Sequence, residues 1–377
     1  MVRFIMKNNR FWSVLGLAGA VAWIAACGSP RLKPSDITDI KFPLSNPVTL
    51  YGMGPMIPPM VPGPGGLVLL ASKTGYLQAF DPANSEAKSF IWKYSVKKAD
   101  TAPVVSAGRI IWADSTGRIF RLDDKGKVIW TNNLSEPVIG EMRVVGTEVV
   151  FRQGEKSLSA LDPEKGDILW RTSNGAIGDW TTDETRIVIR TMDNHIKVVH
   201  PNGRLFLDIP MAEAAVGSFG LDKNFVFIGL AEGRCGCYNL ATGKKRWSIR
   251  LGAEPIGRPV SDGKHVYVVL SSQILAALDA RRGDLLWWSP LSGRGAYTPR
   301  IMGDFVFVSS LSDKLQAFSR KTGKSEIAYT ATREIVAPVE VVGTMLYVVS
   351  NALTEGRLYF INFNLAPPAP AEAVPVK

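Results

Sequence analysis

Cysteine and histidine are scarce in this chain of 377 residues, which contains three of each. Three cysteines cannot form the disulfide framework on which small secreted domains depend. The histidines (His195, His200 and His265) lack the spacing and the neighbouring carboxylates of a metal site. The sequence also contains no phosphate-binding loop, nucleophile elbow or zincin motif. We therefore predict no catalytic residue, no metal and no cofactor.

A membrane-spanning run is also missing near the start of the chain. The apolar stretch at residues 11–23 is shorter than the roughly 20 residues that a transmembrane helix needs. Arg3, Lys7 and Arg10 give it a basic start, and small residues follow it. This combination is typical of a secretory signal peptide, which we predict over residues 1–26.

The end of this peptide, Ile24-Ala25-Ala26-Cys27, resembles a bacterial lipobox, in which an aliphatic and two small residues precede an invariant cysteine. The resemblance implies cleavage before Cys27 and attachment of acyl chains, palmitate among them, to its sulfur and its new amino group. Several acyl chains anchor a protein stably without a spanning helix. By the sorting convention of enterobacteria, Gly28 rather than aspartate implies delivery to the outer membrane. An ordinary signal peptide or a short N-terminal anchor is the alternative.

Acidic residues are outnumbered, with 34 against 44 basic residues and a net charge of +10. Loss of residues 1–26 would remove three basic residues and no acidic one, so the mature chain would be less basic. We expect no nucleic-acid partner for an exported lipoprotein. Residues 27–36 are predicted to be the lipidated cysteine and a tether, and residues 366–377 a disordered tail rich in Pro and Ala.

The middle of the chain repeats with a period near 40 residues. Five tryptophans follow turns at this spacing or at twice this spacing: Trp92, Trp130, Trp170, Trp247 and Trp287. We expect Phe206 to occupy the slot between Trp170 and Trp247, and Ile327 to continue the series. An apolar triplet recurs eight times ahead of these positions, from Val68-Leu69-Leu70 to Leu346-Tyr347-Val348.

Each repeat contains four short runs rich in strand-forming residues, separated by turn glycines such as Gly166 and Gly283. Four antiparallel strands in a period of about 40 residues are the signature of a β-propeller blade. We predict an all-β protein in which residues 37–365 form an eight-bladed β-propeller of four-stranded antiparallel blades. A β-sandwich or barrel with coincidental spacing is the alternative.

The eighth repeat is short, because the chain enters the Pro-rich tail after residue 362 without a fourth strand. An open ring would expose strand edges, which invite aggregation. Residues 37–44 are an unassigned strand-like run at the other end. We predict that this N-terminal strand completes the eighth blade and closes the ring.

The pattern Ala-x-Asp-x-x-x-Gly-x-x-x-Trp is complete at residues 160–170 and 277–287 and nearly so at 237–247. It resembles the tryptophan-docking repeat of quinoprotein dehydrogenases and of the wider PQQ-like propeller families. Glycine permits the positive φ of the turn between third and fourth strands. The indole is a large flat surface that can pack between neighbouring blades.

A lipobox followed by such a propeller resembles the BamB family, the lipoprotein accessories of the machinery that inserts β-barrel proteins into the bacterial outer membrane. The resemblance covers residues 11 to about 365. It implies a lipid-anchored, periplasm-facing, non-enzymatic scaffold, a monomer within a hetero-complex. Its partners would be the periplasmic domains of the barrel-forming subunit (BamA-like) and unfolded outer-membrane proteins, the latter bound by strand pairing. The family's contact motifs are not found in residues 172–183 or 209–222, so no interface residue carries over.

Two alternatives stay open. One is an envelope lipoprotein propeller that binds another protein or a polysaccharide. The other is a PQQ-dependent dehydrogenase, whose adjacent cysteine pair has its nearest counterpart in Cys235-Gly236-Cys237. These cysteines occupy repeat positions that hold Leu and Ala elsewhere, which favours small buried hydrophobes. A disulfide between them would be strained, since extended residues two apart have Cα atoms about 6.5–7 Å apart.

Two opposite faces of the predicted ring are candidates for binding. One face collects the loops that lead into the inner strands, and loops on a rigid scaffold often bind partners. We predict a partner site there that includes Trp180, Arg258, Tyr297 and Arg300. The other face collects the turns between third and fourth strands, which are basic in the fifth and seventh repeats at residues 244–246 and 320–324. This sector could meet anionic lipid headgroups or an acidic partner, or it could simply be solvated.

Overall fold

The computed structural model describes residues 56–81, 90–183, 185–294, 297–331, 333–335, 337–342, 345–351 and 356–362. All of them belong to the unit that runs from Asp39 to Lys377. The predicted signal peptide, the lipidated Cys27, the tether, the closing strand at 37–44 and the C-terminal tail lie outside the described residues. Within these ranges, no helix has the length and apolar character needed to cross a membrane.

Strands make up nearly all of the regular structure, because the apolar runs are short and turn glycines separate them. The described residues form seven antiparallel sheets of four strands and one of three, numbered here as sheets 1 to 8 in chain order. A short 3-10 helix, η1 (Pro64–Gly66), connects the first two strands. Sheets 1 to 4 contain β1 (Met56–Pro62), β2 (Val68–Ser72), β3 (Tyr76–Phe80), β4 (Trp92–Ser95); β5 (Val104–Ser106), β6 (Arg109–Ala113), β7 (Arg118–Leu122), β8 (Val128–Asn133); β9 (Val138–Val145), β10 (Glu148–Gln153), β11 (Ser157–Leu161), β12 (Ile168–Ser173); and β13 (Ile177–Thr182), β14 (Ile187–Thr191), β15 (His195–Val199), β16 (Leu205–Pro210).

The second half of the chain continues the same pattern. Sheets 5 to 8 contain β17 (Ala215–Asp222), β18 (Phe225–Leu230), β19 (Arg234–Asn239), β20 (Lys245–Arg250); β21 (Pro255–Ser261), β22 (His265–Leu270), β23 (Ile274–Asp279), β24 (Leu285–Pro290); β25 (Arg300–Met302), β26 (Phe305–Ser309), β27 (Lys314–Ser319), β28 (Ser325–Thr330); and β29 (Glu340–Val342), β30 (Met345–Asn351), β31 (Gly356–Asn362). In every sheet, strands adjacent in sequence are hydrogen-bonded neighbours.

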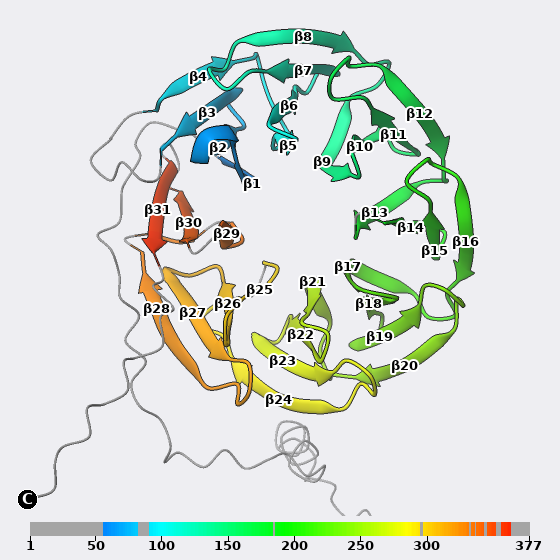
Figure 1. The fold of residues 1–377 in the computed structure, drawn as a ribbon. Coiled ribbons are helices and arrows are strands. Elements are labelled where there is room, and N and C mark those ends of the chain that lie inside the picture. The colour runs from blue at the N-terminus through cyan, green and yellow to red at the C-terminus, as the bar shows by residue number, and fades with distance from the viewer. Residues whose placement is uncertain are drawn as a thin grey trace, which may run out of the picture. The chain divides into compact units, whose positions relative to one another are not determined.

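The sheets stand side by side around a central axis, with the first strand of each sheet nearest to the axis and the last strand outermost (Figure 1). Neighbouring inner strands touch: β1 contacts β5 and β29, and β13 contacts β9 and β17. Middle strands such as β6, β11 and β22 are almost fully buried, as expected for strands covered on both faces. The prediction of an all-β propeller of antiparallel sheets is confirmed, and seven sheets have the predicted four strands.

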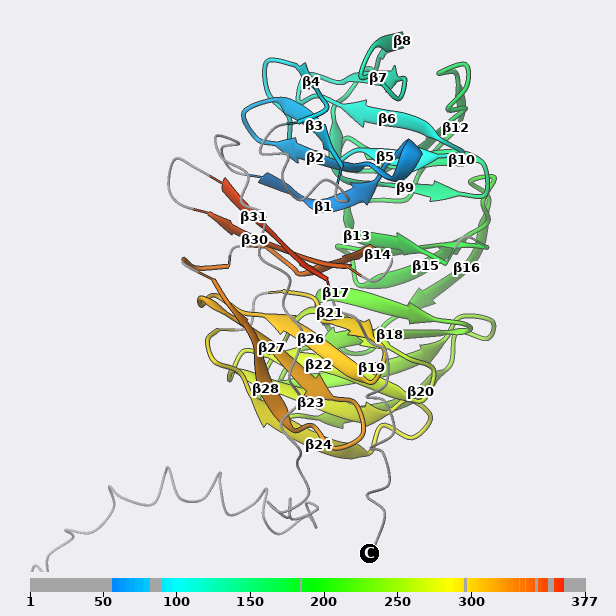
Figure 2. The ribbon, with the colours of Figure 1, turned by 60° about the vertical axis from the view of Figure 1, so that its left-hand side comes forward.

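Sheet 8 adjoins sheet 1. Met60 and Leu70 of sheet 1 share a hydrophobic cluster with Tyr347 and Val349 of sheet 8. Figure 2 shows β30 and β31 beside β1 and β2. The first and last sheets of the described chain are therefore packed against each other like any other neighbouring pair.

In sheets 2 to 6, a β-bulge on the outer strand comes just before the tryptophan position of the repeat. In sheet 3, Ala160 is opposite Trp170 and Leu161 is opposite Ile168, so Leu169 is the extra residue of the bulge. The extra residues of the same bulge in sheets 2, 4, 5 and 6 are Ile129, Phe206, Arg246 and Leu286. The expectation that Phe206 occupies the tryptophan slot is therefore wrong. Leu207 is opposite Val198 there, and Phe206 is 53% exposed.

Each tryptophan of the repeat lies against the turn glycine of the next sheet. A Cβ atom on the glycine would clash with the indole in five pairs: Gly126 with Trp92, Gly166 with Trp130, Gly203 with Trp170, Gly283 with Trp247, and Gly323 with Trp287. All five glycines have positive φ, so side chains are disfavoured there for two reasons. The indole N–H of Trp247 donates to the carbonyl of Ala280 at 3.1 Å. In sheet 4, whose outer strand β16 lacks a tryptophan, Ile209 and Leu207 approach Gly243 instead.

Candidate functional site

The structure places three of the four predicted partner-site residues on inner strands rather than in the loops before them. Trp180 lies within β13, Arg258 within β21, and Arg300 begins β25. Tyr297 lies in the loop before β25, where its backbone passes next to Gly257 of β21. The four residues therefore come from sheets 4, 6 and 7, whose inner strands β13, β21 and β25 lie around the same central axis (Figure 1).

Trp180 is only 5% exposed and packs in the core between sheets 3 and 4. Its ring also lies 5.8 Å from the guanidinium carbon of Arg143, a distance within the range of a cation–π contact. Trp180 therefore positions Arg143 and offers little surface of its own to a partner. Tyr297 is half-buried, and burial, together with nearby Glu334, raises the pKa of its phenol.

Charged side chains of opposite sign meet along the inner strands. We call this group the axial charge cluster, and it consists of Glu141, Arg143, Asp179, Arg258, Arg300 and Glu340. Arg258 Nη1 donates to Thr181 Oγ1 at 2.9 Å, and Nη2 lies 3.8 Å from Asp179 Oδ1. These contacts reach from sheet 6 to sheet 4, past sheet 5. Arg300 Nη2 lies 2.9 and 3.1 Å from the two carboxylate oxygens of Glu340.

Burial governs the electrostatics of this cluster. It lowers the pKa of the Arg143 guanidinium, an effect that the ion pair with Glu141 opposes. It raises the pKa of Glu340, which Arg300 partly counteracts. Two buried atoms of the cluster, Arg143 Nε and Asp179 Oδ2, have no hydrogen-bond partner among the described residues. The cluster therefore combines fixed ion pairs with unused donor and acceptor capacity.

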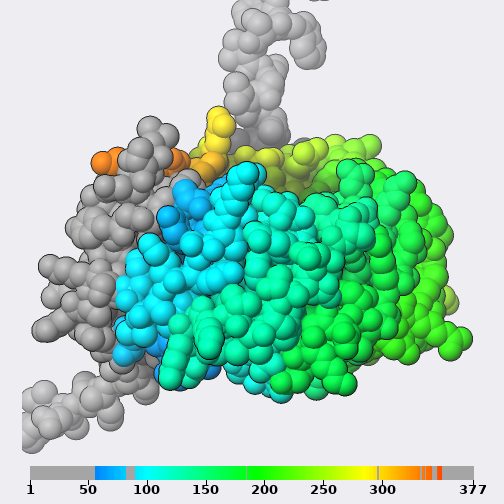
Figure 3. All heavy atoms as spheres, turned by 90° about the horizontal axis from the view of Figure 1, so that it is seen from above, coloured from blue at the N-terminus to red at the C-terminus, as the bar shows by residue number. Residues whose placement is uncertain are grey.

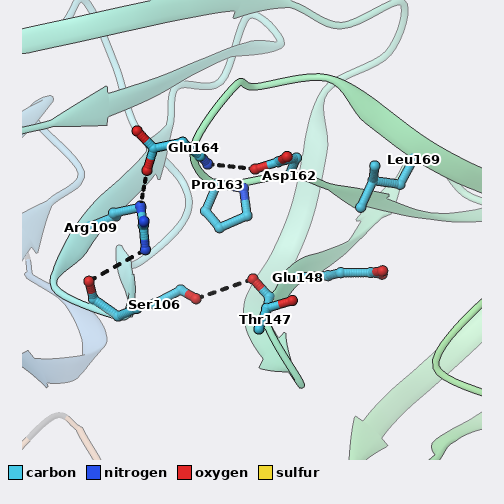
Figure 4. Close-up of a pocket in the computed structure, with 9 residues that line it drawn as sticks. Ser106, Arg109, Thr147, Glu148, Asp162, Pro163, Glu164 and Leu169 are labelled. Carbon is cyan, nitrogen blue, oxygen red and sulfur yellow. Dashed lines mark hydrogen bonds and ion pairs between the residues drawn. The ribbon is translucent and has the colours of Figure 1, made fainter.

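A cavity of about 260 Å³ lies between the turns of sheets 2 and 3 (Figure 4). Its walls include Ser106, Arg109, Glu148, Glu164 and Leu169. Arg109 and Arg121 both pair with Glu164, and they hold the pKa of its carboxyl below the usual value. Glu148 Oε2 accepts a hydrogen bond from the indole of Trp170 at 3.0 Å. The polar groups of this cavity are thus largely engaged, Arg109 with Glu164 between the two sheets and Glu148 within sheet 3, and its lining contains no nucleophile paired with a base.

The two globular cysteines are buried and unpaired. Burial raises the pKa of both Cys235 and Cys237 to about 12, so neither is a thiolate at neutral pH. Both belong to the hydrophobic cluster between sheets 5 and 6. In the part of the chain that the structure describes, no three His, Cys, Asp or Glu residues are grouped as metal ligands.

Radial four-stranded sheets joined by tryptophan–glycine contacts define a PQQ-like β-propeller. A family model described as outer membrane protein assembly factor BamB matches residues 73–205, 192–296 and 271–364. The chain belongs to this family.

Curated relatives bear the same description. The chain is 26% identical over 160 residues to outer membrane protein assembly factor BamB of Yersinia pestis, a match that covers 38% of this chain and 40% of that protein. The corresponding protein of Nitrosomonas eutropha (strain DSM 101675 / C91 / Nm57) is 22% identical over 225 residues, with 54% and 53% covered. The chain thus spans about half or less of the length of these relatives. The crystal structure of BamB from Moraxella catarrhalis has a TM-score of 0.67 at 14% identity, covering 85% of this chain and 99% of that one, and shows the shared fold.

Proposed function

We propose that this protein is a lipid-anchored, non-enzymatic scaffold of the machinery that assembles β-barrel proteins in the outer membrane. The observation that carries the proposal is the family match, which extends over the repeats from residue 73 to residue 364. The relatives named above are assembly factors. The lipobox-like sequence before Cys27 supports an anchor, with the propeller in the periplasm as a monomer within a hetero-complex.

The buried cysteines support a scaffold rather than a quinone-dependent dehydrogenase. Cys235 and Cys237 are protonated and sit among apolar side chains, where neither a disulfide nor a redox-active thiolate is favoured. Their environment is that of two small hydrophobes that fill the space between sheets 5 and 6.

We propose that the barrel-forming subunit, a BamA-like protein, binds the face that collects the loops leading into the inner strands. Arg258 and Arg300 are held by contacts to sheets 4 and 8, so their orientation is fixed before a partner arrives. Tyr297, half-buried beside them, supplies an aromatic surface of the kind enriched at interfaces. Trp180 contributes indirectly, by holding Arg143.

Unfolded outer-membrane proteins are a second proposed partner. The outermost strands have one unpaired edge in their own sheets, and such an edge can accept an extended segment. Their exposed side chains include Ile129 (51%), Leu169 (49%) and Leu205 (48%). Figure 3 shows the outer wall of the molecule on the side of sheets 2 and 3, where the first two of these strands lie.

We also propose that the propeller has eight four-stranded blades and that residues 37–44 close it. The three strands of sheet 8 end with β31 on the outside, where a fourth strand is present in the other sheets. An added outer strand from the N-terminal side would connect the two ends of the chain through backbone hydrogen bonds.

Purification of the tagged, full-length protein from detergent-solubilised membranes tests the function. We expect the barrel-forming subunit to copurify, and we expect Arg258→Ala to reduce its recovery severalfold. Arg204→Ala, an exposed arginine in a turn between third and fourth strands, is the matched control and should leave recovery unchanged. Consistent absence of the subunit would refute the proposal, and capture of a different envelope protein would point to the alternative scaffold role.

A further inference from the structure

Arg246 departs from the residue type that the repeat places at its position. It is the extra residue of the bulge in β20, where the other sheets with this bulge have Ile129, Leu169, Phe206 or Leu286. A bulge turns one side chain out of the regular alternation of the strand. Sheet 5 therefore presents an exposed cation where its neighbours present an apolar side chain.

The guanidinium of Arg246 is held in place without being neutralised. Its Nε donates to the carbonyl of Arg281 in sheet 6 at 2.8 Å. The guanidinium carbon lies 4.7 Å from the centre of the Phe225 ring, with which it forms a cation–π contact. Among the described residues, no carboxylate pairs with Arg246. Its two terminal nitrogens thus form a preoriented fork, the geometry that suits a phosphate group.

Further unpaired cations lie on the turns of sheets 5, 6 and 7. Lys223, Lys244, Lys264 and Arg281 are exposed, and within the described ranges none of them forms an ion pair with a carboxylate. Lys321 of sheet 7 is exposed in the same way. Together with Arg246 we call them the basic turn surface.

These residues share one face of the ring. In sheets 5, 6 and 7, the turn between third and fourth strands is hydrogen-bonded to the turn between first and second strands. The bonds run from Leu240 N to Asn224 O, from Ala280 N to Lys264 O, and from Arg320 N to Asp304 O, at 2.8–2.9 Å. Cations from both kinds of turn therefore reach the same side of the molecule.

The corresponding turns of sheets 2 and 3 have a different balance of charge. Glu164 pairs with both Arg109 and Arg121. The turn that contains Glu164 also has Asp162 and Asp167 around Lys165. The turns of sheets 5 to 7 are thus more basic than those of sheets 2 and 3, and the basic character is no general property of these turns.

We propose that the basic turn surface binds the phosphate groups of anionic phospholipids at the membrane to which the lipid anchor ties the protein, so the inference rests on the proposed anchoring. The cations stand on turns of three adjacent sheets, an arrangement suited to many separate anionic groups in one plane. An anchored protein meets such a plane continuously. Partner binding would then use the opposite face of the ring.

Fluorescence quenching in vesicles tests this contact with the full-length lipidated chain. A dye on Thr242→Cys reports on the basic turn surface, and a dye on Ser272→Cys reports on the opposite face. Both sites are exposed, whereas the two globular cysteines are buried. The vesicles contain phosphatidylcholine with or without phosphatidylglycerol, and a lipid with a nitroxide headgroup as quencher. We expect roughly twofold stronger quenching at residue 242 when phosphatidylglycerol is present, and loss of the difference in high salt.

Charge reversal at Lys244, Arg246 and Arg281 should abolish the lipid-dependent difference. Reversal of Lys125 and Lys127, exposed cations in the equivalent turn of sheet 2, is the matched control and should retain it. Equal quenching with and without phosphatidylglycerol, or an unaffected triple variant, would overturn the proposal. So would quenching that requires the barrel-forming subunit, since the surface would then bind an acidic protein. A chain that does not float with vesicles of either composition would instead refute the anchoring itself.

Discussion

A contact between one indole and one glycine recurs at five joints between sheets, and the sequence predicts the two residues but not their contact. The spacing of Gly166 and Trp170 indicates a turn followed by a packed aromatic residue. The sequence does not show that each indole packs on the glycine of the next sheet, because that pairing depends on how far neighbouring sheets are rotated. The contacts of the axial charge cluster are even harder to predict from the sequence. Arg258 meets Thr181 across 77 positions of sequence, and no local pattern brings them together.

Adjacent tryptophans in β24 allow a direct test of this contact. Trp287 is 6% exposed, packs on Gly323 and donates to the carbonyl of Arg320 at 3.0 Å, whereas Trp288 is 42% exposed. We expect Trp287→Ala to lower the free energy of unfolding by about 3–5 kcal/mol, as for other buried aromatic truncations. Trp288→Ala should cost much less. Urea denaturation followed by circular dichroism measures both, and equal losses would contradict the docking role.

The thiol chemistry of Cys235 and Cys237 gives a second prediction at this scale. Because both are buried with pKa values raised to about 12, a thiol reagent should not react with the native protein at neutral pH. After denaturation without reductant, two thiols per chain should react. Fewer than two would reveal a disulfide or another modification and would reopen a redox role.

Strand register explains where prediction at the scale of elements succeeds and fails. Short apolar runs between turn glycines predict most strands, since each run has a length suited to a strand. Counting from one tryptophan to the next places Phe206 in the slot, because the distance between repeats varies. The bulge is shared by sheets 2 to 6, and counting from the turn glycine is reliable: Leu207 follows Gly203 by four residues, as Trp170 follows Gly166. The side chain that packs is Leu207, one position further on.

A carboxylate at the joint between sheets 6 and 7 should make the free energy of unfolding depend on pH in the acidic range. Asp262, in the turn between β21 and β22, accepts hydrogen bonds from the backbone N–H groups of Lys264 and His265 and from Arg320 of sheet 7. Burial alone would raise the pKa of Asp262, but these donors hold it well below the usual range. Its stabilising effect is therefore complete above the unfolded-state pKa of about 4 and is lost as pH falls toward the folded-state value.

In the Asp262→Asn variant, the free energy of unfolding should consequently depend less on pH under acidic conditions. The free energy of unfolding of the wild type should fall more steeply below about pH 4 than that of the variant. Asp304→Asn, which alters an exposed carboxylate in a neighbouring turn, is the control and should keep the wild-type slope. Chemical denaturation over a pH series measures the slopes, and parallel curves for wild type and Asp262→Asn would argue against this role.

The whole molecule depends on how its two ends are joined. Sheets 1 and 8 share a hydrophobic cluster, so part of the closure is carried by side chains. If residues 37–44 add an outer strand to sheet 8, their deletion should lower the melting temperature by several degrees, because both backbone pairing and side-chain burial are lost. Deletion of residues 366–377 is the control and should have little effect. Equal melting curves for the two deletions would exclude closure by residues 37–44.

Repetition made the architecture predictable from sequence, because the same pattern of triplet, turn glycine and tryptophan recurs in sheet after sheet. Function was less accessible, since the repeat residues are occupied with packing. The informative positions are those that depart from the repeat, such as Arg246, and they become recognisable only once the register of every sheet is known.

One joint of the ring has a different mechanical character from those around it. Between sheets 4 and 5, Leu207 and Ile209 take the place of an indole beside Gly243, and an indole hydrogen bond is absent from this position. Aliphatic side chains can slide past one another without losing a directional bond. The contact at Gly243 therefore has no directional bond to lose, whereas the contact at Gly283 has the bond from Trp247 to Ala280; Arg186 and Asn224 still join sheets 4 and 5 by hydrogen bonds at the rim. Any sliding of one blade on the next would therefore be easier along this contact than along the five contacts that an indole fills.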